Sequence, residues 1–376
     1  MHNAHPMNQN SSQKFRIAYI VSPHGFGHAA RAAAVMAAIK ARNPSVEFEI
    51  ITFVPEWFFS ESLPGGALYH PFDNDVGVVQ VTPFLEDLPA TVERLKSMLP
   101  FQGERLNYLA SHFQKTGAKA VFCDIAPMGL AAAKLAAIPS VLIENFTWDW
   151  IYEGYLDQEP RLADYLAVLR ETFNSADIHI QTEPVCCPTA CDLTVSPTSR
   201  PPRTDSQEIR EMLGIQSGST LILVTMGGIE QGYKAFDRLQ ESSHCTFILP
   251  GSSEKFTRQG NLVLLPHHNG YYHPDLVNAC DAVVGKLGYS TIAESYRAGV
   301  PYGFVPRNHF RETGPLADFV RREMGGVEIF DDKFSNGEWV MQIDEIISHP
   351  RIQRSNPNGA DQIAEFLAEK LELPEG

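Results

Sequence analysis

The sequence predicts an α/β protein made of two doubly wound domains that face each other across a cleft. Short apolar runs alternate with amphipathic helical patterns, the alternation restarts after a proline-rich break, and a glycine-bearing turn follows the first strand of each half. Open α/β sheets bind ligands outside the carboxyl ends of their strands. We therefore expect one composite site between the two domains.

The first half contains five strand candidates. The first, residues 17–21, leads through a glycine turn into a helical pattern that stops at Asn43-Pro44, since helices usually end before proline. A later helix is expected to open with Pro127, because proline suits the first helical position. The other strand candidates are residues 48–54, 120–124, 140–144 and 177–182.

The second half repeats the pattern after a linker. Residues 196–205, SPTSRPPRTD, hold three prolines and no apolar periodicity. The strand candidates that follow are residues 221–225, 246–249, 262–265, 282–284 and 302–305. We expect a disordered lead-in (1–14), a first domain (15–196), a linker (197–205), a second domain (206–350) and a C-terminal segment (351–376). An amphipathic helix over residues 360–373 should dock that segment on a domain.

Composition excludes several classes of protein. The chain has 376 residues, of which 44% are hydrophobic, and a net charge of −15. Such an acidic chain is a poor partner for nucleic acid or an anionic membrane surface. No apolar window is long enough for a transmembrane segment, and the first fourteen residues lack the apolar core of a secretory signal, so we expect a cytoplasmic protein. The sequence leaves the oligomeric state open.

The cysteines do not indicate disulfides or a metal site. Six cysteines are few for this length, and three of them lie singly in apolar runs. The cluster CCPTAC, residues 186–191, is not followed by a second pair of Cys or His at zinc-like spacing. We expect free thiols in a loop and no metal ligands.

The most specific motif is SPHGFGHAAR, residues 22–31, between the first strand and the first helix. Gly25 and Gly27 let the backbone turn sharply beside a ligand, and a helix starting near His28 offers free N–H groups to an anion. The spacing matches neither the dinucleotide fingerprint nor a Walker loop. His24 and His28 frame the turn. We interpret at least one of them as functional; the alternative is that both only cap the helix.

Two segments of the second domain have matching features. VTMGG, residues 224–228, places Gly227 and Gly228 after a strand, where they either hold a phosphate or make a plain tight turn. Residues 279–306 contain a strand, a glycine turn and a helix that we expect Ser290 or Thr291 to cap, with Glu294 in its first turn. Glu294 would then lie beside a bound phosphate and accept hydrogen bonds from ribose hydroxyls.

These segments carry a family likeness. Together they resemble the GT-B glycosyltransferases that use nucleotide sugars, such as the N-acetylglucosaminyltransferase of peptidoglycan synthesis and the UDP-glycosyltransferases. HGFGHAAR, ENFTWDWIY (residues 144–152) and VGKLGYSTIAES (residues 284–295) are most similar to the glycosyltransferase-like N-terminal half of plant L-arabinokinase. The galactokinase-like half is absent, so the resemblance implies no sugar-kinase activity.

The resemblance implies a role for each matching residue. His28 is the general base for the acceptor hydroxyl and Asp124 orients it, a pairing that suits a base working near neutral pH. Glu294 binds the ribose, and the loop 266–272, with His268 and Tyr272, holds the base. The diphosphate turn consists of Gly288, Tyr289, Ser290 and Thr291, helped by Gly25, Gly27, Gly227 and Gly228. No metal or other cofactor is implied, because helix-end amides stabilise the leaving diphosphate.

Two features bear on specificity. Many members hold the sugar hydroxyls with an Asp/Glu-Gln pair, whereas this chain offers Glu312 followed by Thr313. The base loop reads PHHNGYY, so donor sugar and base stay open, with a UDP-sugar as the default. The acceptor is expected on the first domain, where VPEWFFSES (54–62) and NFTWDWIYEGY (145–155) are rich in aromatics. The acceptor-side residues are expected to be His24, Asn145, Trp148 and Asp149.

The sequence therefore predicts an inverting, metal-independent hexosyltransferase that binds a small-molecule nucleotide sugar and an unknown acceptor. Two alternatives stay open on the same fold. One is a hydrolysing nucleotide-sugar epimerase, which needs further carboxylates around the sugar. The other is a non-catalytic nucleotide-sugar-binding protein, favoured if His28 and Asp124 lie too far apart to bond.

Overall fold

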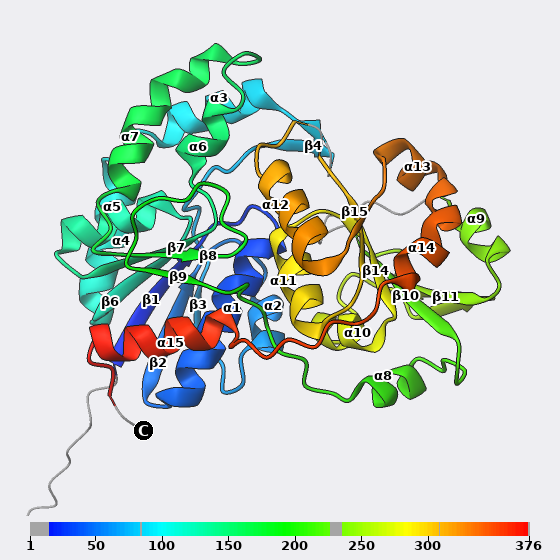
Figure 1. Ribbon diagram of the computed structural model, residues 1–376. Coiled ribbons are helices and arrows are strands. Elements are labelled where there is room, and N and C mark those ends of the chain that lie inside the picture. Colours follow the sequence, from blue (N-terminus) through cyan, green and yellow to red (C-terminus); the bar gives the residue numbers. More distant parts are fainter. Residues whose placement is uncertain (1–14, 83–84, 226–234, 308, 375–376) are drawn as a thin grey trace, which may run out of the picture.

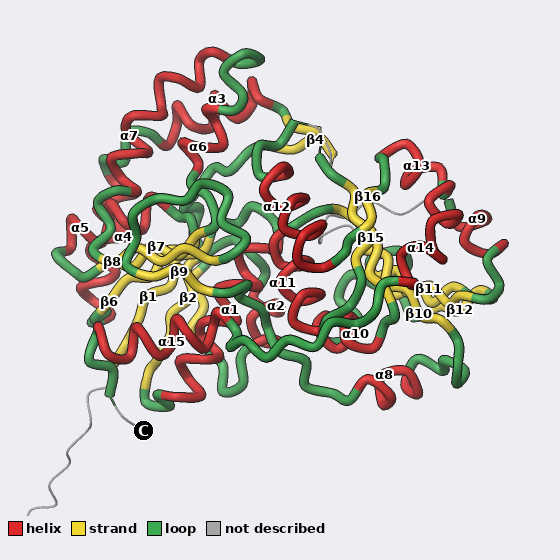
Figure 2. The backbone as a smooth tube through the Cα atoms, in the orientation of Figure 1, coloured by secondary structure: helices red, strands yellow, loops and turns green. Residues whose placement is uncertain are grey.

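Two seven-stranded sheets with helices packed around them make up the protein (Figures 1 and 2). The computed structural model describes residues 15–82, 85–225, 235–307 and 309–374. The predicted fold class, two doubly wound α/β domains, is confirmed. The expected disordered lead-in, residues 1–14, lies outside the described residues.

The first sheet is parallel throughout and has the order β3-β2-β1-β6-β7-β8-β9. Its central strands are apolar and buried, as strands covered on both faces must be. The strands are β1 (Phe15–Val21), β2 (Val46–Ile51), β3 (Leu68–His70), β6 (Ala120–Asp124), β7 (Ser140–Glu144), β8 (Ile178–Thr182) and β9 (Leu193–Val195). A small hairpin, β4 (Gln80–Thr82) and β5 (Leu85–Glu86), lies outside this sheet.

The helices of this half begin and end where local signals place them. Pro127 occupies the first turn of α5, as predicted, and Gly117, in the left-handed conformation, ends α4. The helices are α1 (Phe26–Arg42), α2 (Glu56–Ser62), α3 (Leu88–Met98), α4 (Glu104–Thr116), α5 (Pro127–Ala136), α6 (Trp148–Glu153) and α7 (Ala163–Phe173), with a 3-10 turn at Pro160–Leu162.

The second sheet has the order β12-β13-β11-β10-β14-β15-β16, parallel except for the β12–β13 pair. Its strands are β10 (Thr220–Thr225), β11 (Cys245–Pro250), β12 (Thr257–Gln259), β13 (Leu262–Leu265), β14 (Ala282–Lys286), β15 (Tyr302–Val305) and β16 (Val327–Glu328). The helices are α8 (Ser206–Met212), α9 (Phe236–Glu241), α10 (His273–Ala279), α11 (Tyr289–Ala298), α12 (Thr313–Phe319), α13 (Asp331–Asn336) and α14 (Ile343–Ser348). A π-helical turn, Val320–Met324, extends α12, and a 3-10 turn, Glu338–Gln342, precedes α14.

The last helix, α15 (Gly359–Lys370), lies against the first sheet's α1 and not among the helices of the second sheet (Figure 1). Its Ile363, Ala364 and Leu367 are buried in a cluster with the alanines of α1. Small alanine side chains let the two helices approach closely. The chain therefore crosses between the two halves twice.

The described strands match the ten candidates within a few residues, and the sequence missed the short edge strands. The expected strand at 48–54 lies at Val46–Ile51, and the final helix ends at Lys370 instead of residue 373. The strands that were not predicted are β3, β9, β12, β16 and the β4–β5 hairpin. They are two to three residues long, too short for a periodic pattern to appear.

Both sheets reverse their strand order next to their first strand, between β1 and β6 and between β10 and β14. At the second of these points the backbones lie very close: a Cβ atom on Gly285 would lie 1.8 Å from the carbonyl oxygen of Thr225. Such reversals open a crevice at the carboxyl ends of the strands. Both crevices face the space between the domains, where the site lies.

Candidate active site

Two adjoining cavities occupy the space between the sheets. We call them the inner cavity and the aromatic cavity; they share Phe26, Ser290 and Thr291. The inner cavity is also lined by His24, Gly25, Gly27, His28, Arg31, Gln80, Asn145, Phe146, Lys286, Leu287, Gly288, Tyr289, Arg307, Phe310 and Glu312. The aromatic cavity is also lined by Ala30, Trp57, Phe58, Glu61, Arg200, Thr225, Pro250, His267, Asn269, Tyr271, His273 and Leu276. Both domains contribute to each cavity.

A His–Asp pair lies at the wall of the inner cavity. His28, in the first turn of α1, places its Nδ1 atom 3.0 Å from Oδ1 of Asp124, the last residue of β6. Among the residues that the structure describes, no hydrogen-bond partner is seen for Nε2 of His28. The predicted base and its orienting carboxylate are thus in contact, and Nε2 is left for a ligand.

Arg31 completes this group from the next turn of α1. Its guanidinium donates to both oxygens of Asp124 at 2.7 and 2.8 Å and to Oδ1 of Asn145 at 2.7 Å. Burial alone would raise the pKa of Asp124, but the charge and hydrogen bonds of Arg31, with the bond to His28, outweigh it and lower that pKa. Asp124 is therefore an anion at neutral pH although it is fully buried.

Two helix N-termini meet at the shared wall of the cavities. Helix α1 begins after Gly25, which has a φ of 77°, and α11 begins after Gly288. A Cβ atom on Gly27 would lie 4.0 Å from Oγ of Ser290, so the two helix starts lie side by side. Free N–H groups and helix dipoles make such a wall a binding site for an anion. The predicted residues Gly25, Gly27, Gly288, Tyr289, Ser290 and Thr291 all line it.

The capping expectations for these helices were wrong. No side chain caps α1 or α11, so His24 and His28 are not caps and neither are Ser290 and Thr291. Helix α11 begins at Tyr289, ahead of both residues that were expected to cap it, and its first turn holds no acidic residue. Glu294 lies in the second turn, because glycine at the N-cap position shifts the helix start toward the strand.

Glu294 lies behind the wall of the aromatic cavity and is not exposed in it. Arg200 donates to its Oε1 from Nε at 3.0 Å, and Nδ1 of His273 lies 2.7 Å from its Oε2. Burial alone would raise the pKa of Glu294, but Arg200 and His273 together lower it. Arg200 and His273, not Glu294, line the cavity. The carboxylate therefore holds these two cavity residues in place.

His268 and Tyr272, predicted to hold the nucleotide base, do not line the aromatic cavity. His268 stacks on Trp57 with ring centroids 4.7 Å apart, and its Nε2 lies 2.7 Å from Oε1 of Glu61. Tyr272 packs beneath the guanidinium of Arg203, 4.2 Å from its ring centroid. Their neighbours His267, Asn269 and Tyr271 line the cavity instead. Gly227 and Gly228, predicted to hold the diphosphate, lie outside the described residues.

Of the four predicted acceptor-side residues, the structure brings two into the inner cavity. His24 and Asn145 line it, and burial, with Arg307, His28 and Lys286 nearby, holds the pKa of His24 well below its ordinary value. Trp148 is fully buried and donates from Nε1 to Asp75 at 2.6 Å. Asp149 pairs with Arg170 at 3.2 Å and lines a separate cavity. Buried and ligand-facing aromatics look alike in sequence.

The far end of the inner cavity carries paired charges. Asn145 donates from Nδ2 to Oε1 of Glu312 across the domains at 3.0 Å, and Arg307 lies 3.4 Å from Oε2 of Glu312. The side-chain amine of Lys286 has no hydrogen bond or ion pair among the described residues. Burial, with the charge of Arg307 and against those of Glu312 and Glu86, lowers the pKa of Lys286 to about 7. This end of the cavity can therefore hold a further anion.

Sequence reasoning missed several of these residues. A signal existed for Arg31, which lies three residues after His28 and so on the same face of the helix. Trp57 and Phe58 belong to an aromatic segment assigned to the acceptor, and they line the aromatic cavity instead. No sequence signal selected the others, which are Asp75, Arg200, His273, Lys286 and Arg307.

The chain holds an Asp-x-Asp pattern of the kind that metal-dependent transferases use, Asp73-Asn74-Asp75. Its carboxylates do not converge. Asp73 pairs with Arg94 and Arg105 at 3.2 Å, whereas Asp75 is buried against Trp148. The pattern therefore makes no metal site in this structure.

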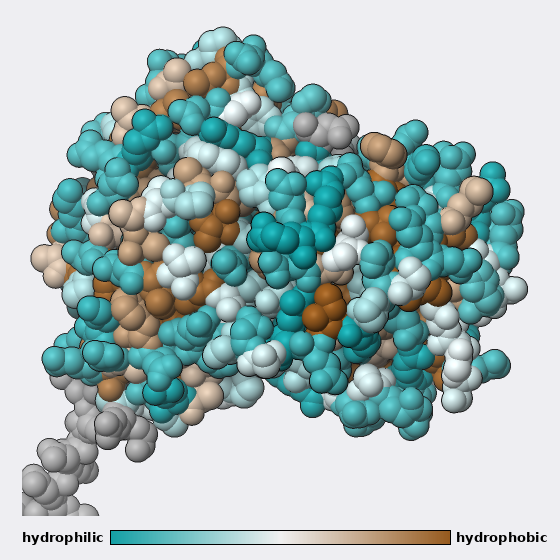
Figure 3. Space-filling view, viewed as in Figure 1, coloured by the Kyte–Doolittle hydropathy of each residue, from teal (hydrophilic) through white to brown (hydrophobic). Residues whose placement is uncertain are grey.

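Other expectations concern the surface and the thiols. All six cysteines are free. No helix in the described part of the chain has the length and apolarity needed to cross a membrane. On the face drawn in Figure 3, hydrophilic residues predominate and hydrophobic ones form small groups.

The two facing sheets, with a site between them at the carboxyl ends of β1, β6 and β14, define the GT-B fold of glycosyltransferases. Among solved structures, the spinosyn forosaminyltransferase shares this fold with a TM-score of 0.59 and 15% identity, covering 96% of each chain. The resemblance stated from the motifs is therefore confirmed at the level of the fold.

Sequence relatives agree. The chain is 27% identical over 371 residues to L-arabinokinase of Arabidopsis thaliana, covering 96% of this chain and 35% of that protein. It is 24% identical over 274 residues to an uncharacterized glycosyltransferase of Methanopyrus kandleri, covering 69% and 78%. The chain thus spans about a third of the length of the arabinokinase. No family model matches the sequence.

Proposed function

We propose that the protein transfers a hexosyl-type group from a nucleotide-diphosphate sugar, by default a UDP-sugar, to an acceptor hydroxyl. The observation that carries the proposal is the 3.0 Å contact of His28 with Asp124, on the wall of a cavity that the start of α11 also lines. A base and an anion site thus face the same space from different domains. Glycosyl transfer from an activated phosphate needs both.

The shared wall supports an order for the parts of the donor. The diphosphate lies against the starts of α1 and α11, where N–H groups are free. The nucleoside then occupies the aromatic cavity between Trp57, Phe58 and Tyr271, because aromatic faces stack on bases. The sugar lies in the inner cavity, within reach of Glu312 and Asn145.

The chemistry is a single displacement at the anomeric carbon. The acceptor oxygen attacks this carbon while its proton passes to Nε2 of His28, and the bond from the carbon to the diphosphate oxygen breaks. Asp124 keeps Nδ1 occupied and stabilises the charged imidazole that forms. One displacement inverts the configuration of the anomeric carbon.

Charge on the leaving diphosphate can be met by the protein itself. The helix N-termini, Lys286 and Arg307 supply the positive potential that a metal ion would otherwise provide. We therefore propose that transfer proceeds without a metal or other cofactor. The acceptor enters beside His24 and Gln80, which line the same cavity.

The alternatives are less well supported. A non-catalytic binding protein was favoured if His28 and Asp124 were apart, and they are in contact. An epimerase needs several carboxylates at the sugar, and Glu312 is the one carboxylate among the described residues that line the inner cavity. The kinase activity named for the arabinokinase is not proposed, because the chain spans only a third of that protein.

The test is the substitution His28→Ala. We expect transfer to be lost while the affinity for nucleotide sugar is retained, because Nε2 acts on the acceptor and not on the donor. Transfer would be followed by release of nucleoside diphosphate, and binding by calorimetry. The control is His179→Ala, which removes a His–Glu pair of the separate cavity. Full activity of His28→Ala would refute the assignment.

Donor identity calls for a separate measurement. A thermal-shift screen of the purified protein against UDP-, GDP- and dTDP-sugars would reveal the donor, because any ligand that binds the folded state raises the melting temperature. The selected donor is then incubated without acceptor. Conversion to an epimer would favour the epimerase, and stability of the donor favours the transferase.

A further inference from the structure

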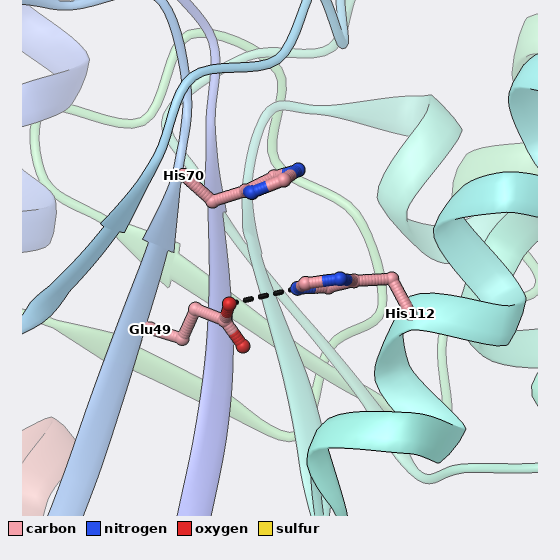
Figure 4. A group of neighbouring side chains, drawn as sticks. All are labelled: Glu49, His70 and His112. Atoms are coloured by element: carbon pink, nitrogen blue, oxygen red, sulfur yellow. Dashed lines mark hydrogen bonds and ion pairs between the residues drawn. The ribbon is translucent and has the colours of Figure 1, made fainter.

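Three side chains from different elements gather at the edge of the first sheet, away from both cavities. They are Glu49 on β2, His70 at the end of β3 and His112 on α4 (Figure 4). One possible ligand atom of each lies within 4.8 Å of the others. Nε2 of His112 is 2.7 Å from Oε1 of Glu49. None of the three lines the inner or the aromatic cavity.

The carboxylate of Glu49 lacks a full set of partners. Glu49 is only 5% exposed, and its Oε2 atom is buried without a hydrogen-bond partner among the described residues. Burying a carboxylate oxygen with no donor is unfavourable unless a cation neutralises it. The nearest elements bring two imidazoles toward this carboxylate (Figure 4). A cation that two imidazoles and one carboxylate can bind together would supply the missing partner of this oxygen.

Each histidine offers one ring nitrogen to a shared ion. Nε2 of His70 lies 3.1 Å from Oη of Tyr108, which leaves Nδ1 as the ligand atom. Metal-binding histidines are oriented in this way by a hydrogen bond at the other ring nitrogen. The rings of His70 and His112 stack with centroids 4.5 Å apart. Both rings must turn about the Cβ–Cγ bond to bind, because the nitrogen lone pair lies in the ring plane.

We propose that Glu49, His70 and His112 form a binding site for a divalent transition metal, with Zn²⁺ as the ion that fits the set. Two imidazoles and one carboxylate, with a water in the fourth position, are a known zinc arrangement. His70 and His112 are partly exposed, so the fourth position reaches solvent. The ion would tie β3, an edge strand paired only with β2 among the described strands, to helix α4.

The site differs from the expectation that the chain has no metal ligands. Glu49, His70 and His112 lie far apart in the sequence, with none of the short spacings by which metal sites are read. Only the fold brings them together. The site is independent of the proposed transferase activity, so its test needs no enzymatic readout.

The test uses the 376-residue chain without an affinity tag, stripped of metal by a chelator and titrated with ZnCl₂ in a calorimeter. We expect about one equivalent of Zn²⁺ to bind the parent protein, and His70→Ala and His112→Ala to lose that equivalent. Glu49→Gln keeps the shape of the side chain and should weaken binding at least tenfold. His179→Ala is the matched control, because His179 lies 2.7 Å from Glu144 in a pair without a second imidazole.

Two further readouts separate this site from the cysteine cluster and from loss of folding. Co²⁺ bound at the proposed site gives no thiolate charge-transfer band, whereas Co²⁺ on Cys186, Cys187 and Cys191 does. Zn²⁺ should raise the melting temperature of the parent but not of His112→Ala, whose circular dichroism without metal reports its folding. Absence of zinc binding, binding that survives both histidine substitutions, or a thiolate band would overturn the proposal.

Discussion

Arg31 holds Asp124 by both carboxylate oxygens, at 2.7 and 2.8 Å, in a pair that is almost fully buried. The same carboxylate also accepts a hydrogen bond from Nδ1 of His28, at 3.0 Å. Asp124 therefore has two roles: it pairs with the buried guanidinium of Arg31, and it orients the proposed base His28. The guanidinium also lies 4.7 Å from the ring centroid of Tyr289 on the other domain, so the pair belongs to the domain interface as well.

Asp124→Asn should lower kcat by about 100- to 10,000-fold, because an amide keeps the shape but cannot hold the charged imidazole. KM for the donor should change little. Steady-state kinetics with the donor found by screening check both values. The control is Asp149→Asn, which removes a buried carboxylate with an arginine partner outside both cavities. Equal losses in the two variants would show that Asp124 acts only through stability.

Arg31→Met should lower the free energy of unfolding by about 3–5 kcal/mol at neutral pH, because it leaves Asp124 buried without its cation. The pKa of Asp124 is below its unfolded value, so the stability it contributes is present above that value and is lost as pH falls through the folded pKa. The gap between variant and parent should therefore shrink in acid. Urea unfolding at several pH values measures it.

Arg161→Met is the control for this prediction. Its pair with Glu159, at 2.7 Å, has an arginine that is 53% exposed, and such surface pairs contribute little to stability. A loss for Arg31→Met as small as that of Arg161→Met would contradict the structural role of the buried pair.

Asp75→Asn should become more stable relative to the parent as pH rises from 4 to 7. Burial raises the pKa of Asp75 to about 6, against the hydrogen bonds that it accepts. Because the folded pKa exceeds the unfolded one, the protonated acid stabilises the fold in acid, and that contribution is lost as pH rises through about 6. Each pKa unit corresponds to about 1.4 kcal/mol, so the free energy of unfolding of the parent should fall by on the order of 3 kcal/mol as this contribution is lost.

Chemical denaturation at pH 4 and 7 measures the effect of Asp75→Asn. Asp73→Asn, two residues earlier with a partly exposed side chain, serves as the control. A pH dependence that is the same in Asp75→Asn and in the parent would disprove the titration of Asp75 in this range.

Lys286→Met should remove a pH dependence from donor binding. The pKa of Lys286 is lowered to about 7, chiefly by burial, and an anionic donor favours the charged amine. Above pH 7 binding must include uptake of a proton, so the affinity should fall by up to about tenfold per pH unit. Calorimetry with UDP-glucose, whose diphosphate keeps its charge, tests this from pH 6 to 9. A slope that persists in Lys286→Met would exclude this lysine.

Trp57→Ala should raise the Kd for the nucleotide by about 10- to 100-fold, since a stacked aromatic side chain contributes about 1–3 kcal/mol to holding a base. His268→Ala removes only the ring behind Trp57 and should have a smaller effect. Calorimetry with UDP and with ribose phosphate separates the base from the phosphates. An unchanged Kd in Trp57→Ala would move the nucleoside out of the aromatic cavity.

Much of the fold could be predicted from the sequence, because long buried parallel strands appear as apolar runs that alternate with helical patterns and glycine turns. The pairing of His28 with Asp124 was predicted only through the family resemblance, and the fold brings the two together because Asp124 ends β6 beside the start of α1. The roles of Glu294, Trp148 and Asp149 were not accessible. Each depends on a partner elsewhere in the sequence, Arg200, Asp75 or Arg170, and no sequence pattern links the two members of these pairs.

The second crossing of the chain makes the second domain an insertion into the first. Both connections lead to the first sheet, and they are bonded to each other: the side chain of Asn358 accepts from the amide of Ser199 at 3.2 Å and donates to its carbonyl at 2.8 Å. The two connecting segments, joined at Ser199 and Asn358, would act as one hinge. We expect any opening of the cleft to be a rotation about that hinge, which would separate Asn145 from Glu312 and leave Ser199 and Asn358 together.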